Sequence, residues 1–109
     1  MKIQYVIKYV TDMDTAVAFH RDRLGLGLRF ASPHWTEFDA GGVTLALHIA
    51  TPDKPAGGAQ IGYQSDDLEA FYAARDRLGV TFTDPPRNEH GARIARFLDS
   101  EGAECSVGG

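Results

Sequence analysis

The sequence predicts an α+β protein of two tandem βαβββ modules. The pentapeptide Arg-Asp-Arg-Leu-Gly fills residues 21–25 and recurs at residues 75–79 of a 109-residue chain. The order of strand-like and helix-like segments also repeats on both sides of a stretch rich in Pro and Gly. Neither half is long enough to bury a secure core alone, so we expect the halves to share one sheet.

Length and composition indicate one globular domain over residues 1–109, with module one at 1–52, module two at 58–109 and a linker at 51–58. The net charge of −4 gives no reason to expect nucleic acid or an anionic membrane as a partner. The single cysteine, Cys105, excludes an intrachain disulfide and a cysteine-cluster metal site. No apolar run approaches the ~20 residues that span a bilayer. We therefore expect a cytoplasmic protein.

The first half begins with a strand at residues 3–10, where β-branched and aromatic residues predominate. A helix follows, with Asp12 as its N-cap and Gly25 as the glycine that ends it. Strands are predicted at 26–31, 35–38 and 43–49, the last two joined by a turn at 39–42.

The second half repeats this order. We expect a strand at 60–64, a helix capped by Asp66 or Asp67 and ended by Gly79, and a strand at 80–83. A polar loop at 84–91 precedes a hairpin of strands 92–98 and 103–107. The offset between halves is 55 at Asp12 and Asp67 but 54 at the pentapeptides, so the second helix should be one residue shorter.

Several short motifs, in this order and spacing, resemble the vicinal oxygen chelate family, which includes glyoxalase I, extradiol dioxygenases and bleomycin-resistance proteins. They lie at residues 10–14, 18–26, 35–38, 41–42, 62–64, 66–68 and 99–102. The resemblance covers essentially the whole chain. It implies that the two modules form a curved mixed sheet around a cavity, with the helices on the outer face. It implies that metal-dependent relatives would hold their ligands on the first and last strand of each module, at the positions of Tyr5, Ala46, Gln60 and Ser106.

These four residues are a poor ligand set for a transition metal. Alanine has no donor atom, and a neutral phenol or hydroxyl is a weak ligand, which leaves only Gln60. We therefore expect no metal and no cofactor, and it stays open whether the chain is an enzyme.

Other residues suggest different chemistry on the concave face. If Glu37 pairs with Thr44 across the turn, then Trp35, Glu37, Thr44, Ala46 and His48 share this face. A Glu37–His48 pair would then be a general acid–base candidate. The alternative is a solvated His48 at a strand end and a Glu37 used in a cap or ion pair.

A cation is expected in the second half. If Ser106 pairs with Ala95, then Arg93, Ala95 and Phe97 point inward, and Arg93 could hold a carboxylate or phosphate. The alternative is a surface ion pair. Aromatic residues would line the cavity wall: Tyr5, Tyr9, Trp35 and Phe97. His20 is expected to pack on its helix, and His34 and His90 to face solvent from loops.

The favoured function is a metal-independent small-molecule binding protein of the glyoxalase/bleomycin-resistance type, which holds a ligand in a concave pocket. The alternatives are a glyoxalase-like lyase, isomerase or dioxygenase with unrecognised metal ligands or the Glu37/His48 pair, and an interaction module with an empty cavity. The resemblance also implies a homodimer. The candidate ligand-binding residues are Tyr5, Trp35, Glu37, Ala46, His48, Gln60, Arg93 and Ser106.

Overall fold

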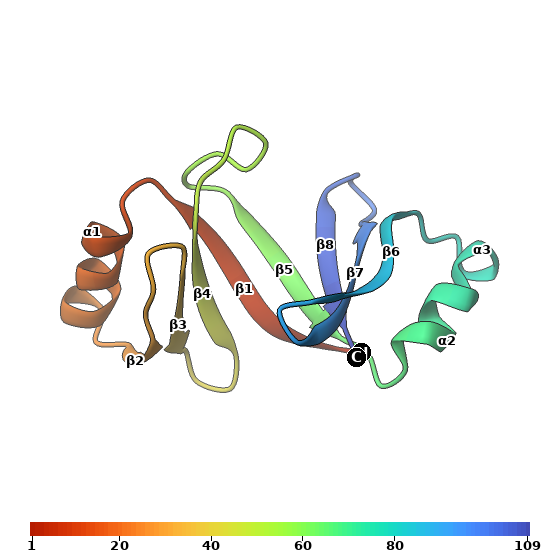
Figure 1. Cartoon of the computed structure of the whole chain (residues 1–109), viewed down its shortest axis with the longest axis horizontal. Coiled ribbons are helices and arrows are strands. Elements are labelled where there is room, and N and C mark those ends of the chain that lie inside the picture. Colours follow the sequence, from red (N-terminus) through yellow and green to blue (C-terminus); the bar gives the residue numbers. More distant parts are fainter. The chain divides into compact units, whose positions relative to one another are not determined.

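The computed structural model describes residues 1–109, and the chain divides into two compact units. One unit is Tyr5–Ala59, and the other comprises Met1–Gln4 with Gln60–Gly109. Figure 1 shows the same succession of a strand, a helical segment and three strands in each half of the chain. The predicted α+β class with two βαβββ repeats is confirmed.

In the first unit the strands lie in the order β2-β3-β4-β1, and β1 belongs to this unit from Tyr5 onward. Strand β1 pairs in parallel with β4, while β4 and β2 run antiparallel to β3. The elements are β1 (Lys2–Val10), α1 (Met13–Ala18), the π-helix η1 (Phe19–Arg23), β2 (Gly27–Phe30), β3 (Trp35–Asp39) and β4 (Thr44–Ile49).

Successive side chains of these strands point to opposite faces of the sheet, and each face carries one apolar cluster. Met13, Phe38 and Leu47 are buried on the face that carries α1. Ile7, Tyr9 and Ala46 form a second cluster. Because successive strand residues point to opposite faces, the second cluster lies on the face turned away from α1.

The second unit repeats the arrangement in the order β5-β8-β7-β6. Strand β5 is parallel to β8, and the remaining pairs are antiparallel. Its core on the helix side is Leu68, Ala95 and Val107. The elements are β5 (Ala59–Gln64), α2 (Leu68–Ala73), α3 (Arg75–Leu78), β6 (Phe82–Glu89), β7 (Ala92–Leu98) and β8 (Glu104–Gly108).

Strand β6 is longer than predicted, because residues 84–89 belong to it and do not form a loop. Pro85 and Pro86 favoured the loop prediction. Both are tolerated since β6 lies at the end of the sheet order and the register shifts between Phe82 and Arg87. Prolines are compatible with an edge strand and with bulges, where no ladder hydrogen bond is lost.

The helix boundaries agree with the predicted caps. The side chains of Asp12 and Asp67 accept from the backbone N–H groups of Thr15 and Ala70, each at 3.0 Å. Gly25 and Gly79 end the two helical segments with φ of 72° and 71°. This left-handed conformation favours glycine.

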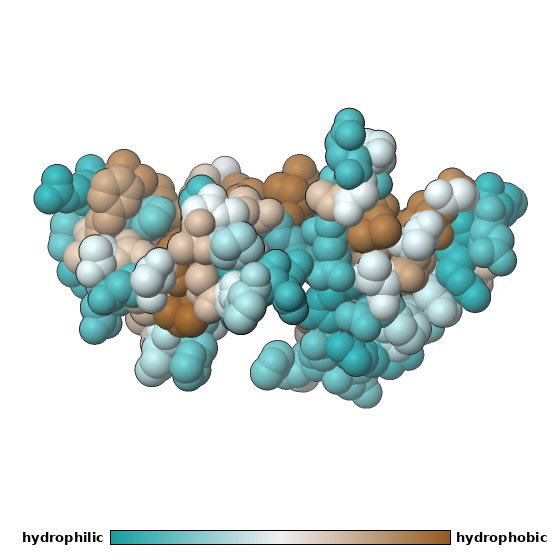
Figure 2. Space-filling model, turned by 90° about the horizontal axis from the view of Figure 1, so that it is seen from above, coloured by the Kyte–Doolittle hydropathy of each residue, from teal (hydrophilic) through white to brown (hydrophobic).

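The leucines of the repeated pentapeptide lie outside the core. Leu24 and Leu78 are 55% and 48% exposed, although their helical spacing favoured packing against the sheet. Each leucine lies at the C-terminal end of its helical segment. Figure 2 shows apolar residues interspersed among polar residues on the face that it displays.

The stretch expected to be a linker is bonded to the first strand. The Gly57 N–H donates to the Tyr9 carbonyl at 2.9 Å, and the Tyr9 N–H donates to Gly58 at 3.0 Å. The ammonium of Lys8 also reaches the Gly57 carbonyl at 2.9 Å. Residues 51–58 thus form an ordered loop on β1. None of the helices is long and apolar enough to cross a membrane.

Candidate functional site

The face of the first sheet turned away from α1 carries a connected row of rings. The Trp35 ring lies 6.1 Å from Tyr5 and 6.0 Å from His48, and Tyr9 lies 5.5 Å from His48, in each case edge to face. Edge-to-face contacts are a preferred geometry of aromatic pairs. We call Tyr5, Tyr9, Trp35, Glu37 and His48 the aromatic face.

A carboxylate lies within this row of rings. The indole Nε1–H of Trp35 donates to Oε2 of Glu37 at 2.8 Å. The Glu37 side chain keeps 24% of its surface exposed, so it can still be reached by a ligand. A hydrogen bond to an ionised acceptor is stronger than a neutral one, and it fixes the orientation of both side chains.

Arg29 adds a cation that sequence reasoning did not single out. Its Nη1 donates to Oγ1 of Thr44 at 2.9 Å and lies 4.0 Å from Oε1 of Glu37. The β2–β3 register shifts between Leu28 and Phe30, which leaves Arg29 as the extra residue of a bulge. A bulge changes the direction in which a side chain points. The local sequence contains no signal that predicts this bulge.

The phenol of Tyr5, on this face, has a pKa that differs from its ordinary value. Burial raises the pKa of the phenol above its ordinary value of 10.0, and the charge of Glu37 raises it further, while Arg29 acts in the opposite direction. The phenol is therefore neutral at physiological pH, since both leading causes disfavour the phenolate.

The predicted sharing of one face by Trp35, Glu37, Thr44, Ala46 and His48 is confirmed. The register differs from the expectation, because Glu37 pairs with Ala46 and Asp39 with Thr44. A shift of two residues preserves the face of every side chain. That these residues bind a ligand stays a prediction.

Glu37 and His48 share the face, but neither bonds to the other. Glu37 accepts from Trp35, and Nδ1 of His48 donates to the carbonyl oxygen of its neighbour Ile49 at 2.6 Å. A general acid–base pair would need one of them to turn toward a substrate.

The four residues at which the family resemblance implies metal ligands in relatives do not suit a metal. Ala46 is fully buried against Ile7 and Tyr9 and offers no donor. Tyr5 is a neutral phenol, and Ser106 is a hydroxyl. No group of three or more His, Cys, Asp or Glu residues is placed to hold a metal ion. The donor chemistry therefore does not fit a transition-metal site.

The expectation for Arg93 was wrong. Ser106 pairs with Arg96 and not with Ala95, and Val107 takes the place opposite Ala95. A register difference of one residue moves a side chain to the other face. Arg93 therefore lies on the helix side, where its Nε donates to Oε1 of Glu69 at 2.8 Å. This is the surface ion pair that was the alternative.

The same shift removes Phe97 from the expected aromatic wall. Its ring packs against Phe71 at 5.7 Å and Phe82 at 5.9 Å in the helix-side core. Arg96 occupies the opposite face instead, and its Nη1 donates to Glu89 at 2.9 Å and Asp84 at 3.4 Å.

The remaining site candidates are Gln60 and Ser106. Gln60 is buried, and Ser106 is half-buried beside Gly62. Ser106 pairs with Gly62 in the second unit as Ala46 pairs with Ile7 in the first, so the parallel strand pairing recurs in both units.

The remaining histidines are placed as expected. His20 packs on its helix, with Nδ1 2.8 Å from the Ala16 carbonyl oxygen and its ring against Phe38. His34 and His90 are exposed. None of the three reaches the aromatic face through a hydrogen bond or ring contact.

Comparison with protein families gives a match over nearly the whole chain. The model of the Glyoxalase/Bleomycin resistance protein/Dioxygenase superfamily matches residues 2–107. No curated protein sequence matches the chain significantly.

Solved structures of similar fold come from several bacteria. Methylmalonyl-CoA epimerase from Mycobacterium tuberculosis aligns with a TM-score of 0.79 at 19% identity, over 98% of this chain and 86% of that chain. A glyoxalase/bleomycin resistance protein/dioxygenase superfamily member from Vibrio splendidus 12B01 aligns with a TM-score of 0.74 at 15% identity, over 98% of each chain. At such identities the likeness shows a shared fold alone.

Proposed function

We propose that this chain, which belongs to the Glyoxalase/Bleomycin resistance protein/Dioxygenase superfamily, is a small-molecule binding protein that works without a metal ion. Membership of the superfamily leaves the activity open, because one fold hosts many functions. The proposal therefore depends on the side chains of the site.

The aromatic face is the observation that carries this proposal. Trp35 joins Tyr5 and His48 in one row of rings, with the carboxylate of Glu37 held beside them. Aromatic walls with a few fixed polar groups are typical of sites for flat or amphipathic ligands. Glu37 and Arg29 would supply the polar contacts of the bound molecule.

The donor chemistry supports a function without a metal. Ala46, Tyr5 and Ser106 offer no imidazole, carboxylate or thiolate at three of the four corresponding positions. Lewis-acid catalysis requires a bound cation that polarises a substrate oxygen. Binding and sequestration of a ligand require no such step.

A lyase, isomerase or dioxygenase is the alternative candidate. The shared face of Glu37 and His48 is the observation in its favour. Proton transfer would require His48 to leave the Ile49 carbonyl and reach a bound substrate.

The proposal is tested by ligand titration of the full chain. Trp35 is the single tryptophan, so its fluorescence reports on the aromatic face. We expect a flat aromatic ligand to quench it saturably and, at 100 times Kd, to raise the free energy of unfolding by about 2.7 kcal/mol.

Glu37→Gln should weaken binding of cationic ligands. Asp53→Asn, a charge change at an exposed residue of the 51–54 turn, serves as the matched control. Absence of quenching and of a thermal shift across an aromatic library would refute the proposal.

The proposal includes a single ligand-binding domain that acts as a cytoplasmic homodimer. Sedimentation equilibrium of the purified chain measures the oligomeric state. A monomer at all micromolar concentrations would remove the dimer from the proposal and leave the binding function to the ligand titration.

A further inference from the structure

We propose that a second site, in the groove between α1 and the turn that joins β2 to β3, binds a small organic cation with an ammonium head and an apolar body. This groove lies on the helix side of β3, opposite the aromatic face. It is therefore independent of the proposed function.

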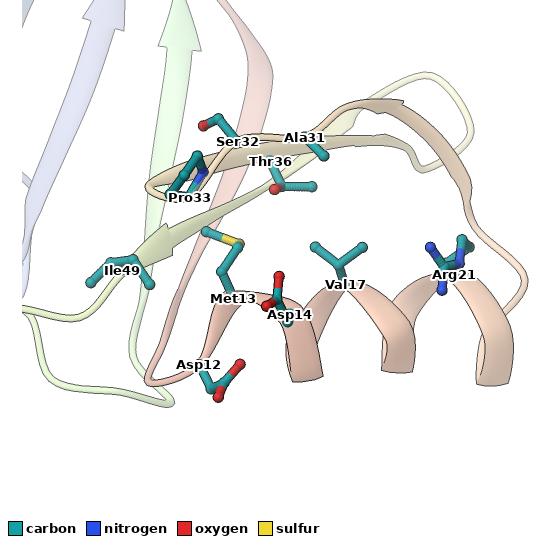
Figure 3. A pocket seen from close by; sticks show the side chains of 10 residues that line it. All are labelled: Asp12, Met13, Asp14, Val17, Arg21, Ala31, Ser32, Pro33, Thr36 and Ile49. Atoms are coloured by element: carbon teal, nitrogen blue, oxygen red, sulfur yellow. The ribbon is translucent and has the colours of Figure 1, made fainter.

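The groove has a helical wall on one side and a wall of turn and strand residues on the other. Met13, Asp14 and Val17 line it from α1, and Pro33, Thr36 and Ile49 line it from the turn and the strands (Figure 3). Its volume is about 630 Å³. Pockets for small ligands commonly have volumes of 300–1,000 Å³ and mostly apolar walls.

Thr36 supplies the observation that points to a ligand. The residue is 0% exposed, and its Oγ1 has no hydrogen-bond partner. The neighbouring hydroxyl of Ser32 is already used, because it donates to the Trp35 carbonyl and accepts from the Trp35 N–H. A buried hydroxyl without a partner is costly, so a group that supplies one is favoured.

The charges of the groove favour a cation. The carboxylate of Asp12 accepts from Thr15 as the helix cap. Arg21 is paired with Asp22 through two hydrogen bonds of 2.8 and 3.0 Å. Asp14 makes no hydrogen bond or ion pair, and Figure 3 shows its carboxylate turned toward the strand wall that bears Thr36.

An ammonium group matches both features. It carries several N–H donors and no acceptor, so one donor can reach the Asp14 carboxylate and another the Thr36 hydroxyl oxygen. An apolar body would pack against the apolar side chains of the groove, which are Met13, Val17, Ala31, Pro33 and Ile49. A neutral alcohol of the same shape could satisfy Thr36 but would leave Asp14 without a counter-charge.

Titration of the ¹⁵N-labelled full chain with benzylammonium tests this proposal, with benzyl alcohol as the neutral match. We expect benzylammonium to shift the amide resonances of Met13, Asp14, Val17 and Thr36 saturably. Benzyl alcohol should bind about tenfold more weakly, which corresponds to one lost charge-assisted contact.

Variants separate the two contacts. Asp14→Asn and Thr36→Val should each raise the Kd for benzylammonium about tenfold. Thr36→Ser keeps the hydroxyl and should bind as the native chain does, and Asp53→Asn removes a charge outside the groove and should change nothing. Thr36→Val should not lower the unfolding temperature, because the native hydroxyl has no partner to lose.

The opposite results would overturn the proposal. An unchanged Kd in Thr36→Val would mean that the hydroxyl is satisfied by water and does not meet the ligand. Equal binding of benzyl alcohol would exclude charge recognition by Asp14. Shifts confined to Tyr5, Trp35 and His48 would place the amine on the aromatic face instead.

Discussion

Tyr5 is one of the four residues at which the family resemblance implies a metal ligand in relatives, and its environment makes the phenol a poorer ligand. Burial and the neighbouring Glu37 both raise the pKa of the phenol. A phenol binds a metal well only as phenolate. Because the surroundings of Tyr5 disfavour the phenolate, they make this residue a still poorer metal ligand. The same perturbation makes folding sensitive to alkaline pH.

We expect the free energy of unfolding to fall as pH rises above about 10. In the unfolded chain the pKa of Tyr5 lies near its ordinary value of 10.0, while in the folded chain the raised pKa keeps the phenol protonated to higher pH. The folded state then binds more protons than the unfolded state, so stability is lost with rising pH. Urea denaturation of the native chain and of Tyr5→Phe between pH 8 and about 12 measures this. An equal pH slope in both chains would contradict it.

At the scale of elements, the two helical segments explain the change of offset from 55 to 54. The first segment contains a π-helix, in which the Leu24 N–H donates to Phe19 five residues earlier. One extra residue in a helix is commonly accommodated as a π-bulge. The sequence predicted that the first helical segment has one extra residue, but not where in the segment it lies. The structure places it in the π-helical turn at Phe19–Arg23, where His20 packs on Phe38.

The two terminal glycines of these segments should respond alike to substitution. Gly25 and Gly79 have nearly equal φ, and a Cβ at either would meet no atom within 4 Å. Gly25→Ala and Gly79→Ala should therefore each destabilise the chain by about 1 kcal/mol, from backbone conformation alone. Chemical denaturation of both variants checks this, and costs that differ by more than about 1 kcal/mol would contradict the structural equivalence of the repeats.

The leucines of the chain should respond unequally. Leu68 is 1% exposed in the core of the second unit, so Leu68→Ala should cost about 2–5 kcal/mol. Leu24→Ala should cost no more than about 0.5 kcal/mol, because the residue is exposed, and Leu78→Ala should behave likewise. Unfolding curves of the three variants give the comparison. A large loss in Leu24→Ala would show that its exposure does not persist in solution.

The two hairpins show how far alternation along a strand can be trusted. Both predicted registers were wrong, the first by two residues and the second by one. The first error left the aromatic face correct, since the period of a strand is two. Because of the second error, Arg93 was predicted on the face that Arg96 occupies. The turn at Asp99 explains this error: the Asp99 carboxylate accepts from the backbone N–H groups of Glu101 and Ala103, and the turn is one residue longer than that of the first hairpin.

At the scale of the whole molecule, the donor chemistry of both units predicts stability without a metal. Protein grown in medium supplemented with Zn, Ni and Fe should purify with far less than one equivalent of each. EDTA should leave the unfolding temperature unchanged, because no folding free energy comes from metal coordination. Elemental analysis and thermal denaturation with and without EDTA test this. One tightly bound metal per chain, with a lower unfolding temperature after its removal, would disprove the metal-independent proposal.

The sequence alone determined the α+β class, the two βαβββ repeats, the capping aspartates and the terminal glycines. These features depend on local rules, such as a cap that bonds three residues on or a glycine that tolerates positive φ. In the first unit it also assigned Trp35, Glu37 and His48 to one face, because an error of two residues in register leaves every side chain on its face, whereas the error of one residue misplaced Phe97.

Only the tertiary structure decided the register of the second hairpin, the bulge that brings Arg29 to Glu37, and the groove around Thr36. Each of these depends on how segments distant in sequence meet. Arg29 bonds to a residue 15 positions later, and Thr36 is buried where a helix formed by residues 13–18 passes β3. Such contacts reflect the packing of whole elements, and local patterns of residue type do not encode it.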